Sequence, residues 1–483
     1  MVPRPAPHAK PGAPSDPRTQ NPEHEAGNQV DSERTSLTWG QAAMVEMFHH
    51  RGLDPVHWPL SIVFDEDACT DEAGVLAALQ GLADRHDVLT AVFEDVGDTF
   101  DHADPDTFPR QIVHRGADVR PLTIEVNSVD APLTGEGVLG LTQSEFVRRR
   151  QAFMPLLINR GGRWSGGAVV SHLAVDGSGL ELLHDEFREL LAGRTPRPRA
   201  AQITEVLKAE RSFEFAQAEK ENLAVVQRML GEAAGTNLRK DPTDAATFGV
   251  VESAEHARSL ARLHSALRVS KPGISLVVYA ILLSVELSTR QVVVRSQHRR
   301  PSPVPGAVSV VANSPFAFTS VTIDPHLTFR DLVVREYAKL VEGYRASLFS
   351  PYGYERVKRA VAAERGIEEI NGVPEFNYLL KAGPRRARAK AIAASRVERS
   401  WYEVVDGIQP NSRGNLSIFE ETDHDVLQLF GTAWRESSDS FEVIRTFNRF
   451  CAVAATDVDQ RVGDILDRAR HAYRRHPVSP SLP

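Results

Sequence analysis

The chain has few cysteines, no long hydrophobic run and no excess of positive charge. Only Cys69 and Cys451 occur among 483 residues, so the sequence predicts neither a disulfide framework nor a cysteine-ligated zinc site. This cysteine usage agrees with a reducing, cytoplasmic setting. The longest apolar run, Ile274 to Val285, is too short to span a bilayer, so no membrane span is predicted. The formal net charge of −8 argues against binding to nucleic acid, which needs many cations facing phosphates.

Both ends of the chain have the composition of tails. The first 33 residues carry seven of the 30 prolines and almost no aliphatic side chains, which predicts a disordered segment. This segment has no apolar core, so no secretory signal peptide is expected. A flexible tail is also expected at residues 476–483. The remaining chain, with 42% hydrophobic and 25% charged residues overall, is typical of a globular protein with a sizeable core.

Two series of alternating strands and helices are predicted between the tails. The first runs over residues 34–200 and ends in a proline-broken joint at residues 195–200. A single long helix is predicted over residues 205–232, bridging two halves of similar size. The second unit, with this linker helix, covers residues 201–475. The predicted fold class is therefore α/β.

The most informative segment runs from Ser171 to Gly177 and has the sequence Ser-His-Leu-Ala-Val-Asp-Gly. A short apolar strand precedes it and an apolar-periodic helix, residues 180–191, follows it. A strand end holds His172 rigidly, and an imidazole, with an unperturbed pKa of about 6.5, can accept a proton at neutral pH. The alternative is a histidine that only satisfies a core hydrogen bond.

This segment resembles the His-His-x-x-x-Asp-Gly signature of condensation domains from non-ribosomal peptide synthesis and related acyltransferases. Ser171 departs from the signature, because the family usually has histidine there, and Thr90 stands where a second arginine is expected. Other family-like segments occur in the family's order, over roughly residues 35–470: Leu-Thr-Trp-Gly-Gln at 37–41, Arg-His-Asp-Val-Leu-Thr-Ala-Val-Phe at 85–93, Arg-Arg-Pro at 299–301, Val-Val-Ala-Asn-Ser-Pro at 310–315 and Phe-Asn-Tyr at 376–378.

The resemblance implies two chloramphenicol-acetyltransferase-like lobes, arranged as a V-shaped pseudo-dimer with the active site between them. It assigns proton transfer to His172 and a structural role to Asp176, paired with Arg300, because an unpaired buried charge is costly. Gly177 is expected to supply backbone freedom and to let a substrate pass close to the main chain. Ser171, Asn313 and Asn377 are expected neighbours of the site.

The implied function is that of a free-standing condensation enzyme that forms an amide or ester bond. An acyl or aminoacyl thioester would arrive on the phosphopantetheine of a carrier protein, and a small-molecule amine or alcohol would accept it. No bound cofactor and no metal are expected, and a monomer is expected. Two alternatives stay open: an O-acyltransferase of the same fold that uses acyl-CoA, and a non-catalytic docking protein.

Two further segments have patterns that occur in binding sites. The segment from Gly135 to Gly140 matches Gly-x-Gly-x-x-Gly, but no acidic residue follows about 20 positions later, so a dinucleotide site is rejected. The basic segment from Lys381 to Arg399 is either a solvated loop or a landing patch for an acidic carrier protein. Arg385, Arg386 and Arg388 are the candidate docking residues in this segment.

Overall fold

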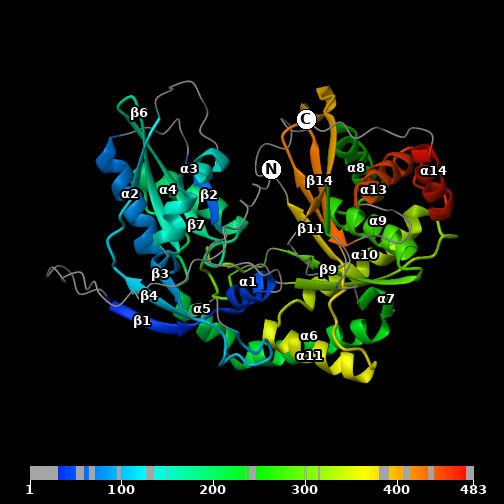
Figure 1. Cartoon of the computed structure of the whole chain (residues 1–483), viewed down its shortest axis with the longest axis horizontal. Helices are drawn as coiled ribbons and strands as arrows, with labels where there is room; N and C mark the ends of the chain where they lie inside the picture. Colours follow the sequence, from blue (N-terminus) through cyan, green and yellow to red (C-terminus); the bar gives the residue numbers. More distant parts are fainter. Residues whose placement is uncertain are drawn as a thin grey trace.

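The computed structural model describes residues 31–49, 59–64, 71–94, 99–126, 135–149, 151–233, 235–238, 246–298, 300, 302–313, 316–379, 391–405, 414–432 and 440–474. Figure 1 shows most of the elements up to α4 on the left and most of those from β8 onward on the right, with α1 near the middle and α6 and α11 along the bottom.

The first half contains two sheets and the helices that cover them. The strand order is β1-β4-β3 in one sheet and β2-β7-β6-β5 in the other, and only β5 and β6 pair in parallel within it. The strands are β1 Asp31–Ser36, β2 Pro59–Val63, β3 Ala91–Glu94, β4 Arg110–Arg115, β5 Leu122–Glu125, β6 Phe153–Arg160 and β7 Arg163–Ser171. The helices are α1 Trp39–His49, α2 Glu72–Arg85, α3 Gly135–Arg149 and α4 Gly177–Leu191, with a 3-10 turn at Asp87–Thr90.

Three helices connect the halves: α5 Ile203–Glu210, α6 Phe213–Glu232 and α7 Gly235–Leu238. The single helix predicted over residues 205–232 is therefore wrong. The chain breaks at Arg211, and Ser212 starts α6 as an N-cap whose side chain accepts a hydrogen bond from the Phe215 N–H at 3.3 Å.

The second half is built on one mixed sheet with the order β10-β9-β11-β13-β14-β8-β12. Helix α9 is apolar all round and buried against this sheet, as expected for a core helix. The strands are β8 Ala246–Ser253, β9 Gln291–Gln297, β10 Phe316–Thr322, β11 Glu375–Leu379, β12 Glu398–Val405, β13 Gly414–Glu420 and β14 Asp425–Thr432. The helices are α8 Ala254–Leu267, α9 Lys271–Glu286, α10 Phe329–Arg345, α11 Pro351–Glu364, α13 Ser440–Ala454 and α14 Val462–Arg474.

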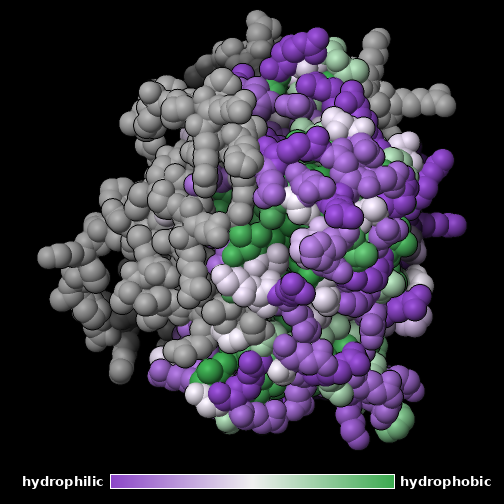
Figure 2. Space-filling view, turned by 90° about the vertical axis from the view of Figure 1, so that its right-hand side faces the viewer, coloured by the Kyte–Doolittle hydropathy of each residue, from purple (hydrophilic) through white to green (hydrophobic). Residues whose placement is uncertain are grey.

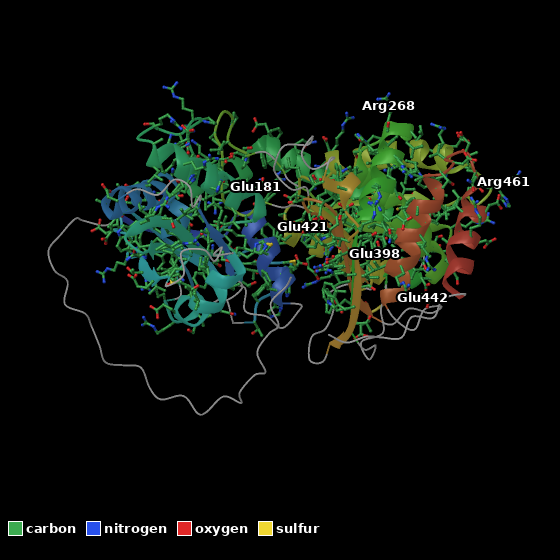
Figure 3. All side chains as sticks on the ribbon, turned by 90° about the horizontal axis from the view of Figure 1, so that it is seen from above. Glu181, Arg268, Glu398, Glu421, Glu442 and Arg461 are labelled. Atoms are coloured by element: carbon green, nitrogen blue, oxygen red, sulfur yellow. The ribbon has the colours of Figure 1, made fainter. Side chains whose placement is uncertain are left out.

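The helices α8, α9, α13 and α14 lie on the outer side of this sheet (Figure 1). The face seen in Figure 2 is mostly hydrophilic with smaller hydrophobic areas, as expected where amphipathic helices cover a core. Viewed from above, Glu181 on α4 and Glu421 after β13 lie toward the middle of the molecule, whereas Arg461 lies at its outer end (Figure 3). No single described helix is both long and apolar enough to cross a bilayer, and the α8–α9 pair that reaches the length is bent by 105°.

A segment of the second half returns to the first half. Between β9 and β10, Val311 forms an antiparallel bridge with Val175, and Val308 forms a parallel bridge with Ala200. The side chains of residues 310–312 belong to the hydrophobic core of the first half. The family-like segment at residues 310–315 is described over residues 310–313, and its only described strand pairing is the bridge at Val311. This crossing brings Asn313 to the signature segment.

Candidate functional site

The signature segment begins in a closed turn at the end of β7. Ser171 is fully buried, and its carbonyl accepts hydrogen bonds from the N–H groups of Ala174 at 2.9 Å and Val175 at 3.1 Å. Its hydroxyl oxygen accepts a further hydrogen bond from the Leu173 N–H at 3.2 Å. Three contacts within five residues hold the position of His172 relative to the sheet.

His172 is half-buried and lies against α1. The ring of Phe48, itself buried, meets the imidazole edge-on, with the ring centroids 6.2 Å apart. This edge-on geometry is one of the arrangements that aromatic rings prefer. The position expected to carry proton transfer therefore lies in a hydrogen-bonded turn with an aromatic neighbour from α1.

Asp176 ends the turn and starts α4 as its N-cap. One carboxylate oxygen accepts from the Gly179 N–H at 2.9 Å and from the Ser178 hydroxyl at 2.7 Å. The other oxygen accepts from the backbone N–H of Asn313 at 3.0 Å. Three such donors stabilise the buried carboxylate. The geometry is that of the structural role predicted for Asp176.

Arg300 does not contact Asp176 directly in the described structure. Its guanidinium donates from Nη2 to the side-chain oxygen of Asn313 at 3.0 Å, and no ion pair with Asp176 is formed. Asn313 thus lies between the two, bound to Asp176 through its backbone and to Arg300 through its side chain. The direct pair implied by the resemblance is wrong, because backbone and hydroxyl donors occupy the carboxylate where a guanidinium was expected.

Two glycines allow α1 and α4 to approach the crossing segment closely. A Cβ atom added at Gly40 would lie 1.9 Å from the carbonyl oxygen of Ala312, and one added at Gly179 would lie 2.4 Å from that of Val310. Both distances are far below van der Waals contact, so any side chain at these positions would force the backbone apart. The small residues explain how two helices and an extended segment meet at one point.

Gly177 behaves differently from the prediction made for it. It is the first residue of α4 and does not adopt a positive φ, so the predicted need for backbone freedom is wrong. A Cβ atom added there would have nothing within 4 Å. The expected passage of a substrate beside Gly177 stays a prediction.

The family-like segment at residues 37–41 is the start of α1. The Thr38 N–H donates to the side chain of Gln41 at 2.9 Å, and the Gln41 N–H donates to the Thr38 hydroxyl at 3.3 Å. This reciprocal pair is a capping box. The Trp39 N–H is bound instead by Glu210, whose two carboxylate oxygens lie 3.1 and 3.0 Å from it. Glu210 was not foreseen, because nothing in the pattern of a predicted long helix marks one acid as buried.

The family-like segment that starts at Arg85 anchors the far end of α4. Arg85 and His86 bind the buried carboxylate of Glu186 on α4, with distances of 2.8 Å from Nε and 2.5 Å from Nε2. Burial alone would raise the pKa of Glu186, but the hydrogen bonds from His86 and Arg85 hold that pKa below its usual value. Sequence reasoning did not single out Glu186. The available signal was its position on the buried face of an apolar-periodic helix, where a carboxylate needs a partner.

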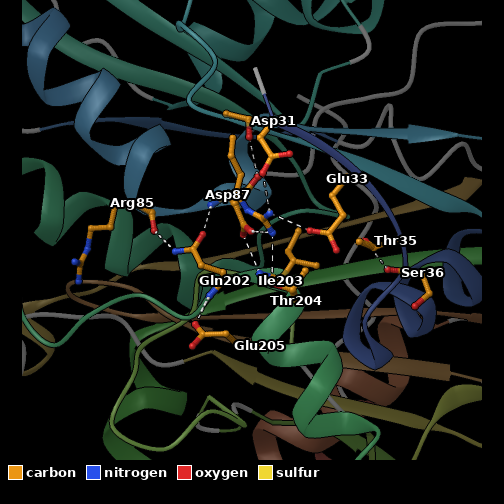
Figure 4. A network of polar contacts seen from close by, with 12 residues as sticks. Asp31, Glu33, Thr35, Ser36, Arg85, Asp87, Gln202, Ile203, Thr204 and Glu205 are labelled. Carbon is orange, nitrogen blue, oxygen red and sulfur yellow. Dashed lines mark hydrogen bonds and ion pairs between the residues drawn. The ribbon is translucent and has the colours of Figure 1, made fainter. Parts of the chain in front are cut away.

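Asp87 extends this anchor to α5, as Figure 4 shows. Its carboxylate accepts from the Ile203 N–H at 2.9 Å and lies 3.5 Å from Nη2 of Arg115. Burial raises the pKa of Asp87, and these two partners oppose that rise. Thr90, the departure from the family pattern, donates its hydroxyl to the Asp87 carbonyl at 2.9 Å and so closes the 3-10 turn.

The remaining predicted positions are spread more widely. Asn377 lies on β11, half-buried, in register with Ser417 of β13, and no described hydrogen bond joins it to the signature segment. Gly135 and Gly140 lie in the first turns of α3. Arg385, Arg386 and Arg388 are outside the described residues.

Described residues line a small cavity beside the crossing segment and a larger groove elsewhere. A small one of about 20 Å³ lies where α1 meets the crossing segment, and Trp39, Arg300 and Asn313 line it. A groove of about 890 Å³ lies between β1 and α5 and includes Lys208 and Arg211, but none of the predicted site residues. No cluster of three or more metal-ligating side chains occurs within the described ranges.

Comparisons with known proteins find similar folds among solved structures but no match by sequence. No family model matches the sequence, and no curated protein matches it either. Solved structures do match: the condensation domain of the monacolin K polyketide synthase MokA has a TM-score of 0.63 at 13% identity, covering 90% of this chain and 100% of that one. The starter condensation domain of rhizomide synthetase, a variant in complex with C8-CoA, has a TM-score of 0.61 at 13% identity, covering 89% and 96%.

A third similar structure is the X-domain from teicoplanin biosynthesis, with a TM-score of 0.59 at 16% identity, covering 92% of this chain and 99% of that one. The same X-domain fold is also seen in a complex with OxyB. At these identities the likeness concerns the fold. The chain has a condensation-domain-like α/β fold, as the resemblance implied.

Proposed function

We propose that this protein is a condensation enzyme that joins a carrier-bound acyl or aminoacyl thioester to an amine or hydroxyl acceptor. The observation that carries the proposal is His172, held by the closed turn at the end of β7 and by Phe48 in a fold shared with condensation domains. Similarity of fold alone does not assign an activity, so the proposed activity depends on the His172 side chain.

The proposed reaction needs one proton acceptor and two positioned reactants. The acceptor nitrogen or oxygen attacks the thioester carbonyl, its proton passes to the His172 imidazole, and the carbon–sulfur bond breaks. The same proton then leaves on the thiol of the phosphopantetheine arm, so the histidine is regenerated and the atoms balance. General-base catalysis of this kind typically contributes on the order of 10²–10⁴ in rate, and positioning of the two reactants can contribute more.

The test compares His172→Ala with a matched histidine variant. His184 lies on the neighbouring helix α4 with about a third of its side chain exposed, 31%, so His184→Ala controls for losing an imidazole near the turn. We expect His172→Ala to lower turnover roughly a hundredfold or more and His184→Ala to retain it. Product formation from acyl-carrier protein and a panel of amines and alcohols, followed by mass spectrometry, measures this. Equal turnover of His172→Ala and the parent would rule out general-base chemistry.

The alternative donor is a free acyl-CoA, which is favoured by the C8-CoA bound to the similar starter condensation domain. The same assay distinguishes the donors, because turnover with acyl-CoA and none with acyl-carrier protein would establish the alternative. A docking role is the remaining candidate, suggested by the X-domain bound to OxyB. Carrier binding with no turnover of either donor would favour it.

A further inference from the structure

The groove between β1 and α5 is large enough for a small molecule and lies apart from the signature segment. Its volume of about 890 Å³ falls in the range of about 300–1,000 Å³ that is usual for ligand sites. One wall consists of residues 33–36 of β1 and Arg110 at the start of β4, and the other consists of α5 and Ser212, the N-cap of α6. None of the residues assigned to the proposed reaction lines this groove.

Side-chain hydrogen bonds join the two walls of the groove. Nη2 of Arg211, the C-cap of α5, donates to the Ser36 hydroxyl at 2.7 Å. Arg115 binds both walls, because its Nη1 lies 2.9 Å from a carboxylate oxygen of Glu33 and its Nη2 lies 3.4 Å from the Thr204 hydroxyl (Figure 4). The width of the groove is therefore set by contacts between β1 and α5 at more than one point.

Two cations in the groove have no carboxylate partner. Lys208 and Arg211 are exposed, and neither forms an ion pair with any described residue. Glu210, the acid next to Arg211 in the chain, binds the first N–H of α1 instead. The acid in the groove lining, Glu33, is paired with Arg115 at 2.9 Å. The positive charges of Lys208 and Arg211 therefore remain available to a ligand.

A third available cation comes from the opposite wall. Arg110 stands opposite Ser36 in the β1–β4 ladder, and its nearest carboxylate, that of Asp106, is 3.8 Å away and 92% exposed. An exposed pair of this kind contributes little, so most of the charge of Arg110 is also available. The fourth cation, Arg34, is bound closely by Glu94 at 2.7 Å. Since the whole chain has a net charge of −8, this groove is a local concentration of positive charge.

We propose that the groove binds a small molecule that carries a diphosphate group. Lys208 and Arg211 are three positions apart, a spacing that places two side chains on the same face of a helix, so both reach the same ligand. The planar guanidinium of Arg211 donates to phosphate oxygens through its fork of N–H groups, and the ammonium of Lys208 adds a compact charge beside it. Two adjacent cations without acids of their own fit two adjacent phosphates, and Arg110 contacts them from the other wall. This site does not depend on the proposed reaction.

Isothermal titration calorimetry of the full chain with inorganic pyrophosphate and with ADP, at low ionic strength, tests the site. The test variant combines Lys208→Gln with Arg211→Gln. Its matched control combines Lys220→Gln with Arg262→Gln, which removes the same charges at exposed positions on α6 and α8, where neither residue pairs with an acid of the described chain. Lys208→Gln alone keeps the bond from Arg211 to Ser36, so it keeps the test decisive if the double variant folds poorly.

We expect the parent and the control variant to bind each probe equally well, and the test variant to bind at least about tenfold more weakly, the scale of one lost hydrogen bond to a charged group. Added salt should weaken binding to the parent, because it screens exposed charges. Equal affinity for pyrophosphate and ADP would assign recognition to the diphosphate alone, whereas tighter binding of ADP would assign it to a nucleoside diphosphate.

Three results would overturn the proposal. The first is no binding of either probe to the parent protein. The second is equal affinity of the test and control variants, which would show that Lys208 and Arg211 do not hold the ligand. The third is AMP binding as tightly as ADP, because a single phosphate would then be sufficient.

Discussion

The indirect link between Asp176 and Arg300 predicts a specific pattern of stabilities. A direct buried ion pair would lose about 3–5 kcal/mol when either partner is removed, with strong coupling between the two changes. In this structure Asp176 is bound by backbone and hydroxyl donors, and Arg300 reaches it only through the Asn313 side chain. The two changes should therefore couple weakly.

The contacts give the expected magnitudes. Asp176→Asn keeps an oxygen for the Gly179 N–H but turns an amide toward the Asn313 N–H, so it should cost about 1–3 kcal/mol, the range for one unsatisfied buried polar group. Arg300→Met removes a buried cation and one hydrogen bond, and should cost about 1–2 kcal/mol. Their coupling should stay below about 1 kcal/mol, the size of an indirect interaction.

Urea denaturation of a triple-mutant cycle measures this coupling. Asn313→Ala removes the side-chain acceptor of Arg300 and keeps the backbone N–H that binds Asp176. In that background the cost of Arg300→Met should fall, while the cost of Asp176→Asn should not change. The opposite result is coupling of several kcal/mol between Asp176→Asn and Arg300→Met even in the Asn313→Ala background. That result would show a direct pair and would refute the indirect link through Asn313.

Two further expectations concern stability. Gly40→Ala should destabilise the protein by about 1–3 kcal/mol, because its Cβ would overlap the Ala312 carbonyl. Gly177→Ala, whose Cβ would have nothing within 4 Å, should be close to neutral in the same denaturation assay. Equal losses of stability in the two variants would contradict the close packing at Gly40. The pKa of Glu210 rises from 4.5 to about 8 on folding, so the stability it contributes is present below pH 4.5 and is lost as the pH rises through 8. Glu210→Gln should flatten this part of the stability profile, and an unchanged profile would mean that another group titrates.

Elements with a local signal were predictable from the sequence. Helix α2 has such a signal, because Asp71 caps it by accepting from the Gly74 N–H and because its apolar residues share one face. The break between α5 and α6 also had a local signal, the N-cap Ser212, but the continuous apolar period obscured it. Local patterns therefore predicted where helices lie better than where they divide.

Contacts between distant segments could not be predicted in the same way. Glu210 and Trp39 are 171 positions apart, and Asn313 and Asp176 are 137 apart. Which buried acid receives which donor depends on where the crossing segment enters the first half, and no periodicity encodes that. The resemblance placed Arg300 and Asn313 near the site, yet it assigned the wrong partner to Arg300. The sequence therefore predicts which polar residues lie near the site, but it does not predict which residues they bind.

Ser171 stands where the family usually has histidine, and the structure gives this serine a role of its own in the turn. Its side chain is fully buried, and its hydroxyl oxygen closes the turn by accepting from the Leu173 N–H at 3.2 Å. An imidazole is far larger than a hydroxyl and cannot occupy this position without displacing packed neighbours. Ser171→His should therefore destabilise the protein, by about 1–3 kcal/mol as for an overpacked core, and should not raise turnover.

Ser171→Ala is the matched control for this prediction, because it removes the hydroxyl and adds no volume. We expect it to cost about 0.5–1.5 kcal/mol, the net value of one hydrogen bond, and to leave most of the turnover at His172. Denaturation midpoints and turnover of both variants, measured side by side, separate loss of the hydrogen bond from overpacking. A Ser171→His protein that is as stable as the parent and faster would show that the turn accommodates an imidazole, and that serine lowers an activity the fold could otherwise support. The expected order of stability, parent above Ser171→Ala above Ser171→His, would instead show that serine is part of how this chain builds the turn.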